Sequence, residues 1–329
     1  MADERQNQRD SFARTATGNS ALTLERASMD AGFRSYWRGD HNGVSVIVMD
    51  SPPDKEDVRP WLRVRDQLAA AGVRVPRVDA RDVEHGFLLL EDLGANTMLQ
   101  AIESREAEVW FEQAMQELLK IQALPIDPAL PTYDREMLAR ELRLFDDWFV
   151  GKHLQHSLSC EDLENLELAY SRLIDAIITY PQSWVHRDFM PRNLMPVANG
   201  VAVLDFQDAV TGPIAYDVLT LFKDAFVSWP ADFVKTQWRK YHTLARERGL
   251  NVPDDFDTFQ KQLDFIGIQR HLKVIGIFAR LCHRDQKPKY VADVPRFFSY
   301  LDEVVPKYAE LQPLQDVLAK TVKPLLAKV

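Results

Sequence analysis

Cysteine is scarce in this chain of 329 residues, which contains only Cys160 and Cys282. The two residues stand far apart, outside any spacing that pairs cysteines as metal ligands or as a redox couple. The sequence therefore offers neither a zinc site nor a disulfide framework, and we predict two ordinary thiols.

Long apolar runs are also missing. No stretch approaches the roughly 18 apolar residues that a membrane helix requires. The polar segment Met1–Arg9 has no apolar core of the kind found in a signal sequence. Together these absences predict a cytoplasmic protein with no membrane partner.

An excess of positive charge is absent as well. The chain has 40 Lys and Arg against 49 Asp and Glu, a formal net charge of -9. Such a balance disfavours a nucleic-acid-binding module, because those proteins carry a basic footprint. The 46% hydrophobic content permits a large core, and the length fits a two-lobed enzyme or two domains. We expect no nucleic-acid partner, and a monomer is the default assumption.

Apolar patterns at the start of the chain predict a small antiparallel sheet. Its strands are expected at Ala21–Leu24, Ser35–Arg38, Val44–Met49 and Phe87–Leu90. The segment Gly39–Gly43 has the turn chemistry of a hairpin between the second and third strands. A helix is predicted over Lys55–Ala71, ending near Gly72.

The apolar period changes to that of helices after residue 92. It recurs at Trp110, Ala114, Leu118 and Ile121, and again from Leu163 to Ile177 before Pro181. The sequence shows no internal repeat and no low-complexity linker. We therefore predict two lobes, residues 1–92 and residues 93–329, divided at this change of period.

The segment Ser183–Phe206 interrupts the helical pattern with short strand-like pieces around a polar loop. If Asn199-Gly200 forms a two-residue hairpin turn, antiparallel pairing places Leu194 opposite Asp205. Asn193 and Asp205 are then expected to meet at the open end of the hairpin.

These side chains suit phosphate chemistry. An amide oxygen at Asn193, a carboxylate at Asp205 and a second carboxylate at Asp188 make an all-oxygen environment of the kind that Mg²⁺ prefers. Phosphoryl transfer needs a metal to offset phosphate charge and a carboxylate to accept the proton of the attacking hydroxyl. We predict that Asn193 and Asp205 hold Mg²⁺ and that Asp188 is the catalytic base.

The same segment has a recognisable pattern. His-x-Asp-x-x-x-x-Asn at residues 186–193, then Asp205-Phe206, then Gly212–Asp217, resembles the aminoglycoside phosphotransferase and choline kinase family of the protein-kinase-like superfamily. The resemblance implies an α+β, two-lobed fold. A small antiparallel-sheet N-lobe binds the nucleotide, and a larger, mainly helical C-lobe carries the catalytic loop and the substrate-binding helices. It also implies ATP and Mg²⁺ as cofactors, with His186 and Asp217 supporting the catalytic loop.

Two further segments become candidates for nucleotide contacts through this resemblance. Gly32, Phe33 and Arg34 lie where a loop would cover the phosphates, and a plain turn is the alternative. Glu91 and Leu93 lie where the family connects its lobes, so their backbone groups are candidates for adenine binding. The alternative for this pair is an ordinary strand end.

One position departs from the family. Kinase-like proteins carry a lysine on the third strand, but this chain reads Val46–Met49 there. Arg34, Arg38 and Lys55 are the alternatives for holding phosphate. The sequence therefore leaves open the alternative that this chain is a catalytically silent nucleotide-binding relative of the kinases. The intact set of predicted catalytic and metal-binding residues argues against that alternative.

The substrate side resembles one bacterial branch of the family, the anomeric kinases of N-acetylmuramate and N-acetylglucosamine in cell-wall recycling. The shared segments are Arg34–Trp37, Val46–Asp57 and Phe87–Gly94. The resemblance implies that the anomeric hydroxyl of the sugar attacks the terminal phosphate of ATP, with Asp188 removing its proton.

The charge of the late segments bears on this choice. Residues 261–290 are rich in Lys, Arg and His and poor in Asp, which suits a neutral or anionic sugar better than a polycationic antibiotic. Arg270 and Arg280 are candidates for a sugar carboxylate, and Asp208 for sugar hydroxyls. A solvated helix face explains the same charges equally well. A kinase for an aminoglycoside, choline or another amino alcohol remains an alternative.

Overall fold

The computed structural model describes residues 2–28, 33–102 and 107–326. The chain forms two compact units. The first comprises Met1–Ile121 and Pro191–Ala209, and the second comprises Gln122–Met190 and Val210–Val329. The segment Pro191–Ala209, which contains Asn193 and Asp205, thus belongs to the first unit. The lobe boundary at residue 92 stays a prediction.

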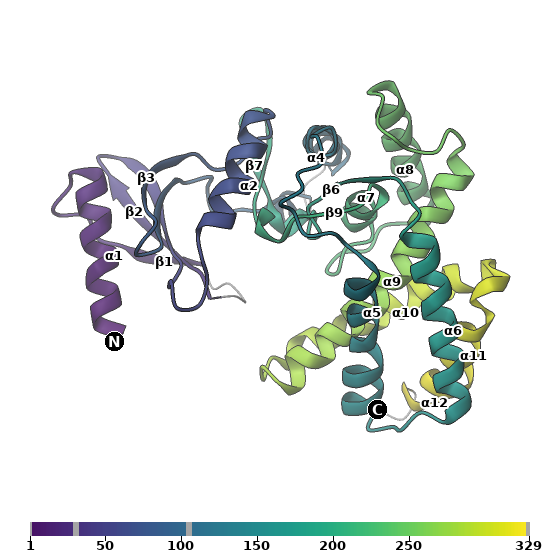
Figure 1. The fold of residues 1–329 in the computed structure, drawn as a ribbon. Helices are drawn as coiled ribbons and strands as arrows, with labels where there is room; N and C mark the ends of the chain where they lie inside the picture. The colour runs from purple at the N-terminus through teal and green to yellow at the C-terminus, as the bar shows by residue number, and fades with distance from the viewer. Residues whose placement is uncertain (1, 29–32, 103–106, 327–329) are drawn as a thin grey trace. The chain divides into compact units, whose positions relative to one another are not determined.

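A five-stranded antiparallel sheet with the order β1-β2-β3-β5-β4 forms the first unit's larger sheet. Figure 1 labels three of its strands, β1, β2 and β3. Its strands are β1 Glu25–Ser28, β2 Ser35–His41, β3 Val44–Asp50, β4 Val78–Asp82 and β5 Phe87–Glu91. The hairpin of β2 and β3 turns at Asn42 and Gly43, with φ angles of 56° and 79°. Positive φ at both positions is typical of the Asn-Gly turns that match strand twist, so the predicted hairpin is confirmed.

The first predicted strand, Ala21–Leu24, is wrong. β1 begins at Glu25, which pairs with Arg38 of β2. Leu22 instead packs into a buried cluster with Val46 and Val48, and Leu24 packs against that cluster. The apolar residues at 21–24 therefore mark burial beside the sheet and not strand pairing.

The described helices of the first unit are α1 Ala2–Thr17, α2 Arg59–Ala70, α3 Met98–Ala101 and α4 Ala107–Gln122, whose last residue belongs to the second unit. The predicted helix ending near Gly72 is confirmed as α2, although it begins at Arg59 and not at Lys55. Helix α1 was missed because its sequence is polar. It is held by charge: Arg5 Nη2 lies 2.7 Å from Asp50 Oδ1, and the Arg9 guanidinium stacks 3.4 Å from the Trp37 ring. Such contacts leave no apolar period in the sequence.

A short hairpin, β7 Leu194–Val197 and β8 Gly200–Val203, completes the first unit. The Val203 N–H donates to the Arg74 carbonyl at 2.7 Å. The Phe206 ring packs against Trp61 of α2 with a centroid separation of 5.0 Å. These contacts fix the end of the hairpin against the rest of the unit.

The second unit is mainly helical. Its helices and strands are α5 Arg135–Leu144, α6 Cys160–Ile177, β6 Gln182–Val185, β9 Val210–Pro213, α7 Ala215–Phe222, α8 Ala231–Glu247, α9 Phe256–His283, α10 Val294–Val304, α11 Gln312–Val317 and α12 Lys323–Leu326. A π-helical segment, Phe145–His153, continues α5. The helices predicted from the periods at 110–121 and 163–177 are confirmed as α4 and α6.

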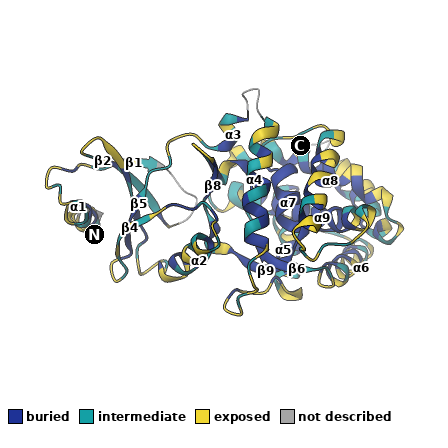
Figure 2. Ribbon diagram, turned by 90° about the horizontal axis from the view of Figure 1, so that it is seen from above, coloured by how far each residue is buried: buried dark blue, intermediate teal, exposed yellow. Residues whose placement is uncertain are grey.

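Helix α9 is the central element of this unit. Every residue from 262 to 276 is buried, charged side chains included, and Figure 2 shows α7 and α9 mostly in the colour of buried residues. A Cβ atom at Gly276 would meet the backbone carbonyl of Leu144 in α5, so α5 and α9 approach closely at this glycine. No helix among the described residues is both long and apolar enough to cross a membrane.

Candidate active site

The predicted catalytic loop begins directly after β6, and its first residues, which lie in the second unit, are anchored by Asp217 of α7. The fully buried Asp217 accepts from the His186 N–H at 2.6 Å and from the Arg187 N–H at 3.0 Å. Burial raises the pKa of Asp217 to about 6, although His186 and the two backbone hydrogen bonds favour its charged form. The carboxylate therefore fixes the backbone immediately before Asp188.

Arg187 holds the loop in an unusual conformation. Its φ of 73° is a left-handed value that a long side chain seldom adopts. Its Nη2 donates to Glu141 Oε1 at 2.7 Å, and its carbonyl accepts from Arg270 Nη1 at 3.2 Å. Because several contacts determine this backbone, its strain is maintained in the folded chain.

Asp188 itself is accessible. Its side chain is 42% exposed, and Arg270 Nη2 lies 3.8 Å from its Oδ1. The guanidinium of Arg270 is buried and also donates to the Tyr216 hydroxyl at 3.1 Å. A reachable carboxylate on an anchored loop has the properties required of a general base.

A buried charge network lies behind the loop. Glu141 of α5 accepts from Lys273 Nζ at 2.7 Å in addition to Arg187, and it also bonds the Tyr133 hydroxyl and Gln269. Burial alone would raise the pKa of Glu141, but Lys273 and Arg187 lower it to about 2. Our sequence interpretation missed Glu141. Glu141 lies three residues after Leu138 and four before Phe145, so it falls on the apolar stripe of the helix. A charged residue within such a stripe is the sequence feature from which its burial could have been predicted.

Asn193 and Asp205 meet in the first unit, as expected, but through another register. Leu194 pairs with Val203, not with Asp205, and Ala198 and Asn199 form the turn. The register prediction is wrong because Gly200 takes its positive φ of 137° as the first residue of β8.

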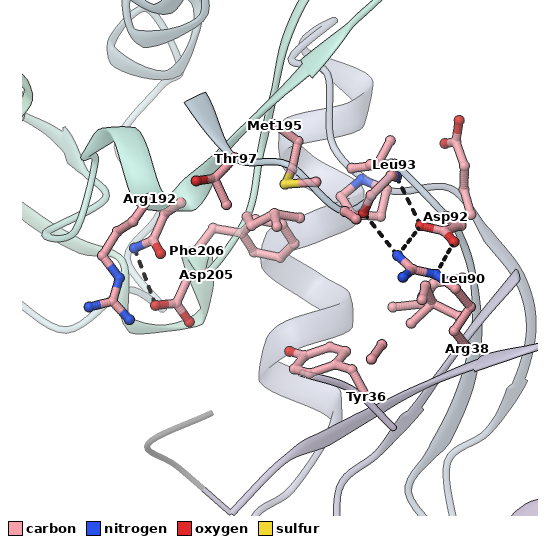
Figure 3. Close-up of a pocket in the computed structure, with 18 of the residues that line it drawn as sticks. Tyr36, Arg38, Leu90, Asp92, Leu93, Thr97, Arg192, Met195, Asp205 and Phe206 are labelled. Carbon is pink, nitrogen blue, oxygen red and sulfur yellow. Dashed lines mark hydrogen bonds and ion pairs between the residues drawn. The ribbon is translucent and has the colours of Figure 1, made fainter. Parts of the chain in front are cut away.

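The contacts of this pair are direct. Asn193 Nδ2 donates to Asp205 Oδ2 at 3.4 Å (Figure 3), and the Leu204 N–H donates to the Asn193 carbonyl at 2.9 Å. Asp205 adopts φ 62° and ψ 35°, and its Oδ1 accepts from Gln207 at 2.8 Å. Within the described ranges, no three His, Cys, Asp or Glu side chains gather in a metal cluster. One carboxylate and one amide nevertheless fit Mg²⁺, which takes few protein ligands.

A pocket of about 330 Å³ opens beside this pair within the first unit. Figure 3 shows Tyr36 and Leu90 on the sheet side, with Met195 and Phe206 on the hairpin side. The segment after β5 also lines it through Asp92, Leu93, Gly94, Ala95 and Thr97. Apolar faces opposite one another, with backbone groups at one edge, suit a flat aromatic ring.

The two predicted adenine-binding residues line this pocket. The Glu91 carboxylate binds Arg74, with Oε2 2.9 Å from Nη1, and this contact lowers the pKa of Glu91. The Glu91 N–H donates to the Arg77 carbonyl at 2.9 Å. The Glu91 N–H is therefore occupied by Arg77, and the Glu91 carbonyl is the backbone group of this residue that stays a candidate for adenine.

The predicted phosphate loop is described in part. Gly32 lies outside the described residues. Phe33 is 65% exposed, whereas Arg34 is 7% exposed. Arg34 Nη2 lies 4.0 Å from Asp205 Oδ1, so the buried cation stands beside the predicted metal-binding carboxylate.

The three predicted substrate residues occupy different settings. Asp208 is exposed and accepts from Gln207 Nε2 at 3.3 Å. Arg270 is 3% exposed, whereas Arg280 is partly exposed, and burial together with Arg284 lowers its pKa. The two arginines are ten positions apart, about 15 Å along α9, so one carboxylate cannot contact both residues through short hydrogen bonds unless their side chains converge.

An anchored carboxylate loop, an Asn–Asp pair and a pocket beside an antiparallel sheet define a protein-kinase-like phosphotransferase. Residues 23–250 match the model of the phosphotransferase enzyme family. The chain belongs to this family, as the sequence motifs predicted.

Particular relatives cover nearly the whole chain. The N-acetylmuramate/N-acetylglucosamine kinase of Pseudomonas putida is 46% identical over 319 residues, 97% of this chain and 94% of that protein. The kinase of the same name from Pseudomonas aeruginosa is 47% identical over 293 residues, 89% and 87% of the two chains.

Solved structures agree on the fold. A choline/ethanolamine kinase family protein from Mesorhizobium loti superposes with a TM-score of 0.64 at 14% identity, covering 94% of this chain and 98% of that one. At this identity the likeness concerns the fold alone. The predicted α+β, protein-kinase-like architecture is confirmed.

Proposed function

We propose that this chain transfers the terminal phosphate of ATP to the anomeric hydroxyl of N-acetylmuramate and N-acetylglucosamine, giving the sugar 1-phosphate. The observation that carries the proposal is the exposed Asp188 carboxylate on a loop fixed by Asp217 and Arg270. The choice of sugar is supported by relatives of 46% and 47% identity that bear this activity in their names.

Asp188 orients the sugar hydroxyl and accepts its proton as the oxygen attacks phosphorus. The anomeric hydroxyl is the most acidic hydroxyl of a sugar, which eases this transfer. Arg270 holds the Asp188 carboxylate by charge, and Asp217 prevents the loop backbone from moving away. His186 contributes through its backbone N–H and exchanges no proton with substrate.

The nucleotide binds in the first unit, in the pocket that Leu90 and Phe206 line. Adenine presents an amino donor beside a ring-nitrogen acceptor, which matches the Glu91 carbonyl and the Leu93 N–H. We keep the nucleotide-binding lobe at residues 1–92 and the catalytic and substrate-binding lobe at residues 93–329. Asn193 and Asp205 would hold Mg²⁺, which supplies positive charge next to the phosphates.

The test is Mg²⁺-dependent ADP release with N-acetylmuramate, N-acetylglucosamine, kanamycin and choline as separate acceptors. We expect turnover of the two amino sugars, with ³¹P–¹H coupling in the product between phosphate and the anomeric proton. Asp188→Asn should lower kcat at least about 100-fold, the contribution of a general base. Asp232→Asn, at an exposed position in the first turn of α8, is the matched control and should leave kcat unchanged.

Each other result has a defined meaning. Turnover of kanamycin or choline alone would show that the acceptor is an antibiotic or an amino alcohol and not an amino sugar. Nucleotide binding without turnover of any acceptor would favour a silent relative. Equal activity of Asp188→Asn and wild type would remove Asp188 as the base.

A further inference from the structure

The third strand of the sheet supplies no cation for phosphate. β3 runs Val44–Asp50 with no Lys or Arg in it, and the side chain of Met49 is fully buried. Phosphoryl transfer depends on positive charge around the phosphates. Another residue of the first unit must therefore provide the side-chain cation if the proposed function holds.

Arg34 forms an ion pair with Asp205, the predicted metal-binding carboxylate. It directly precedes β2, is 7% exposed, and places Nη2 4.0 Å from Asp205 Oδ1. Its Nε lies 3.4 Å from Glu56 Oε2. Both carboxylates are partly exposed, with side-chain values of 31% for Glu56 and 37% for Asp205.

The guanidinium keeps unused donors. Within the described part of the chain, neither Nε nor Nη1 of Arg34 makes a hydrogen bond, although both atoms are buried. Guanidinium offers five N–H donors, and leaving a buried charged donor unsatisfied is costly. Because Nε faces Glu56, Nη1 is the unsatisfied donor that remains for an incoming anion.

The alternative cations are less suitable. Arg38 places Nε and Nη2 2.6 and 3.0 Å from the Asp92 carboxylate and also donates to the Gly94 carbonyl (Figure 3). It is thereby committed to the segment that follows β5. The side chain of Lys55 is 54% exposed and pairs with Asp54.

We propose that Arg34 takes the place of the missing third-strand lysine by binding phosphate oxygens of the nucleotide beside Asp205, and that Glu56 orients its guanidinium. A planar guanidinium binds phosphate through two parallel N–H groups, which a lysine cannot do. Glu56 is a positioning residue, because it acts on the nucleotide only through Arg34. This inference rests on the proposed nucleotide site but not on the identity of the sugar.

The experiment compares ATP, ADP and adenosine binding by calorimetry, with no acceptor present. Losing a charge-assisted hydrogen bond should weaken ATP and ADP binding by roughly 10- to 100-fold in Arg34→Met, while adenosine binding stays unchanged. Arg34→Lys should recover part of the loss because it restores charge without the planar fork. Arg81→Met, at an exposed arginine of β4, is the control and should bind all three ligands as wild type does.

Glu56 is tested by non-additivity. Glu56→Gln should weaken ATP binding less than Arg34→Met does, and the double variant should bind ATP no more weakly than Arg34→Met alone. Additive losses would remove the positioning role.

Two results would overturn the assignment of Arg34: unchanged ATP binding in Arg34→Met, or equal losses for ATP and adenosine in both Arg34 variants. Wild-type protein that binds none of the three ligands would instead refute the proposed nucleotide site. Wild-type ATP binding without turnover of an amino sugar would refute only the proposed acceptor.

Discussion

Removing the charge of Glu141 is the most direct test of the buried network behind the catalytic loop. Glu141→Gln keeps the shape of the side chain but leaves Arg187 and Lys273 without their shared buried anion, which lies 2.7 Å from each. Lowering the pKa of Glu141 from its ordinary 4.5 to about 2 corresponds to roughly 3 kcal/mol of folding free energy at neutral pH. We therefore expect the variant to lose about 3 kcal/mol.

The pH dependence follows from the direction of this pKa. A carboxyl whose pKa is lower in the folded chain stabilises the fold above its unfolded pKa, and the stabilisation is lost as pH falls through the folded value. The difference between Glu141→Gln and wild type should thus be constant from pH 7 to pH 5. It should fall to about half near pH 3.

Urea unfolding followed by tryptophan fluorescence measures this difference at each pH. Glu136→Gln, on the exposed side of the same helix, is the control and should stay within about 0.5 kcal/mol of wild type. A Glu141→Gln variant as stable as this control would refute the reasoning. A difference that stayed constant down to pH 3 would assign the loss to packing and not to charge.

Two other predictions concern α9. Gly276→Ala should destabilise the chain by about 2 kcal/mol or more in urea, because the new Cβ meets the Leu144 carbonyl in the backbone of α5. Gly267→Ala, whose Cβ would meet side-chain atoms of Leu219 at 3.2 Å and of His271 at 3.5 Å but no backbone, should change stability by less than about 1 kcal/mol; equal effects would deny the close approach of α5 and α9. Replacing Arg270 or Arg280 with Ala should raise KM for N-acetylmuramate far more than for N-acetylglucosamine, and equal increases would remove the carboxylate-binding role. Because Arg270 is buried beside Asp188, we expect Arg270→Ala to lower kcat as well. Arg280→Ala should leave kcat unchanged.

The sequence was informative where local chemistry decides the structure. The Asn42-Gly43 turn needs two positive φ angles, and the Asn-Gly pair supplies them. Helix α2 ends where Gly72 takes a φ of 75°. The predicted catalytic motif is likewise local, since the spacing of Asp188, Asn193 and Asp205 is visible in one short segment.

The sequence was less informative where charge or distant packing decides. The polar helix α1 is held by arginines on Asp50, Phe87 and Trp37. The hairpin register depended on which residue adopts the positive φ, and composition does not select between Asn199 and Gly200. Charged residues on α9 were compatible equally with a solvated face and with a binding surface.

The sequence by itself determined the family, the predicted catalytic base and the expected meeting of Asn193 with Asp205. These follow from motifs whose residues are close in the chain. Only the tertiary structure showed that Arg270 lies 3.8 Å from Asp188 and Glu141 2.7 Å from Arg187, across 82 and 46 positions of sequence. It also placed the buried Arg34 beside Asp205. The energies of such charges depend on burial and on partners brought together by folding, and no local pattern records either.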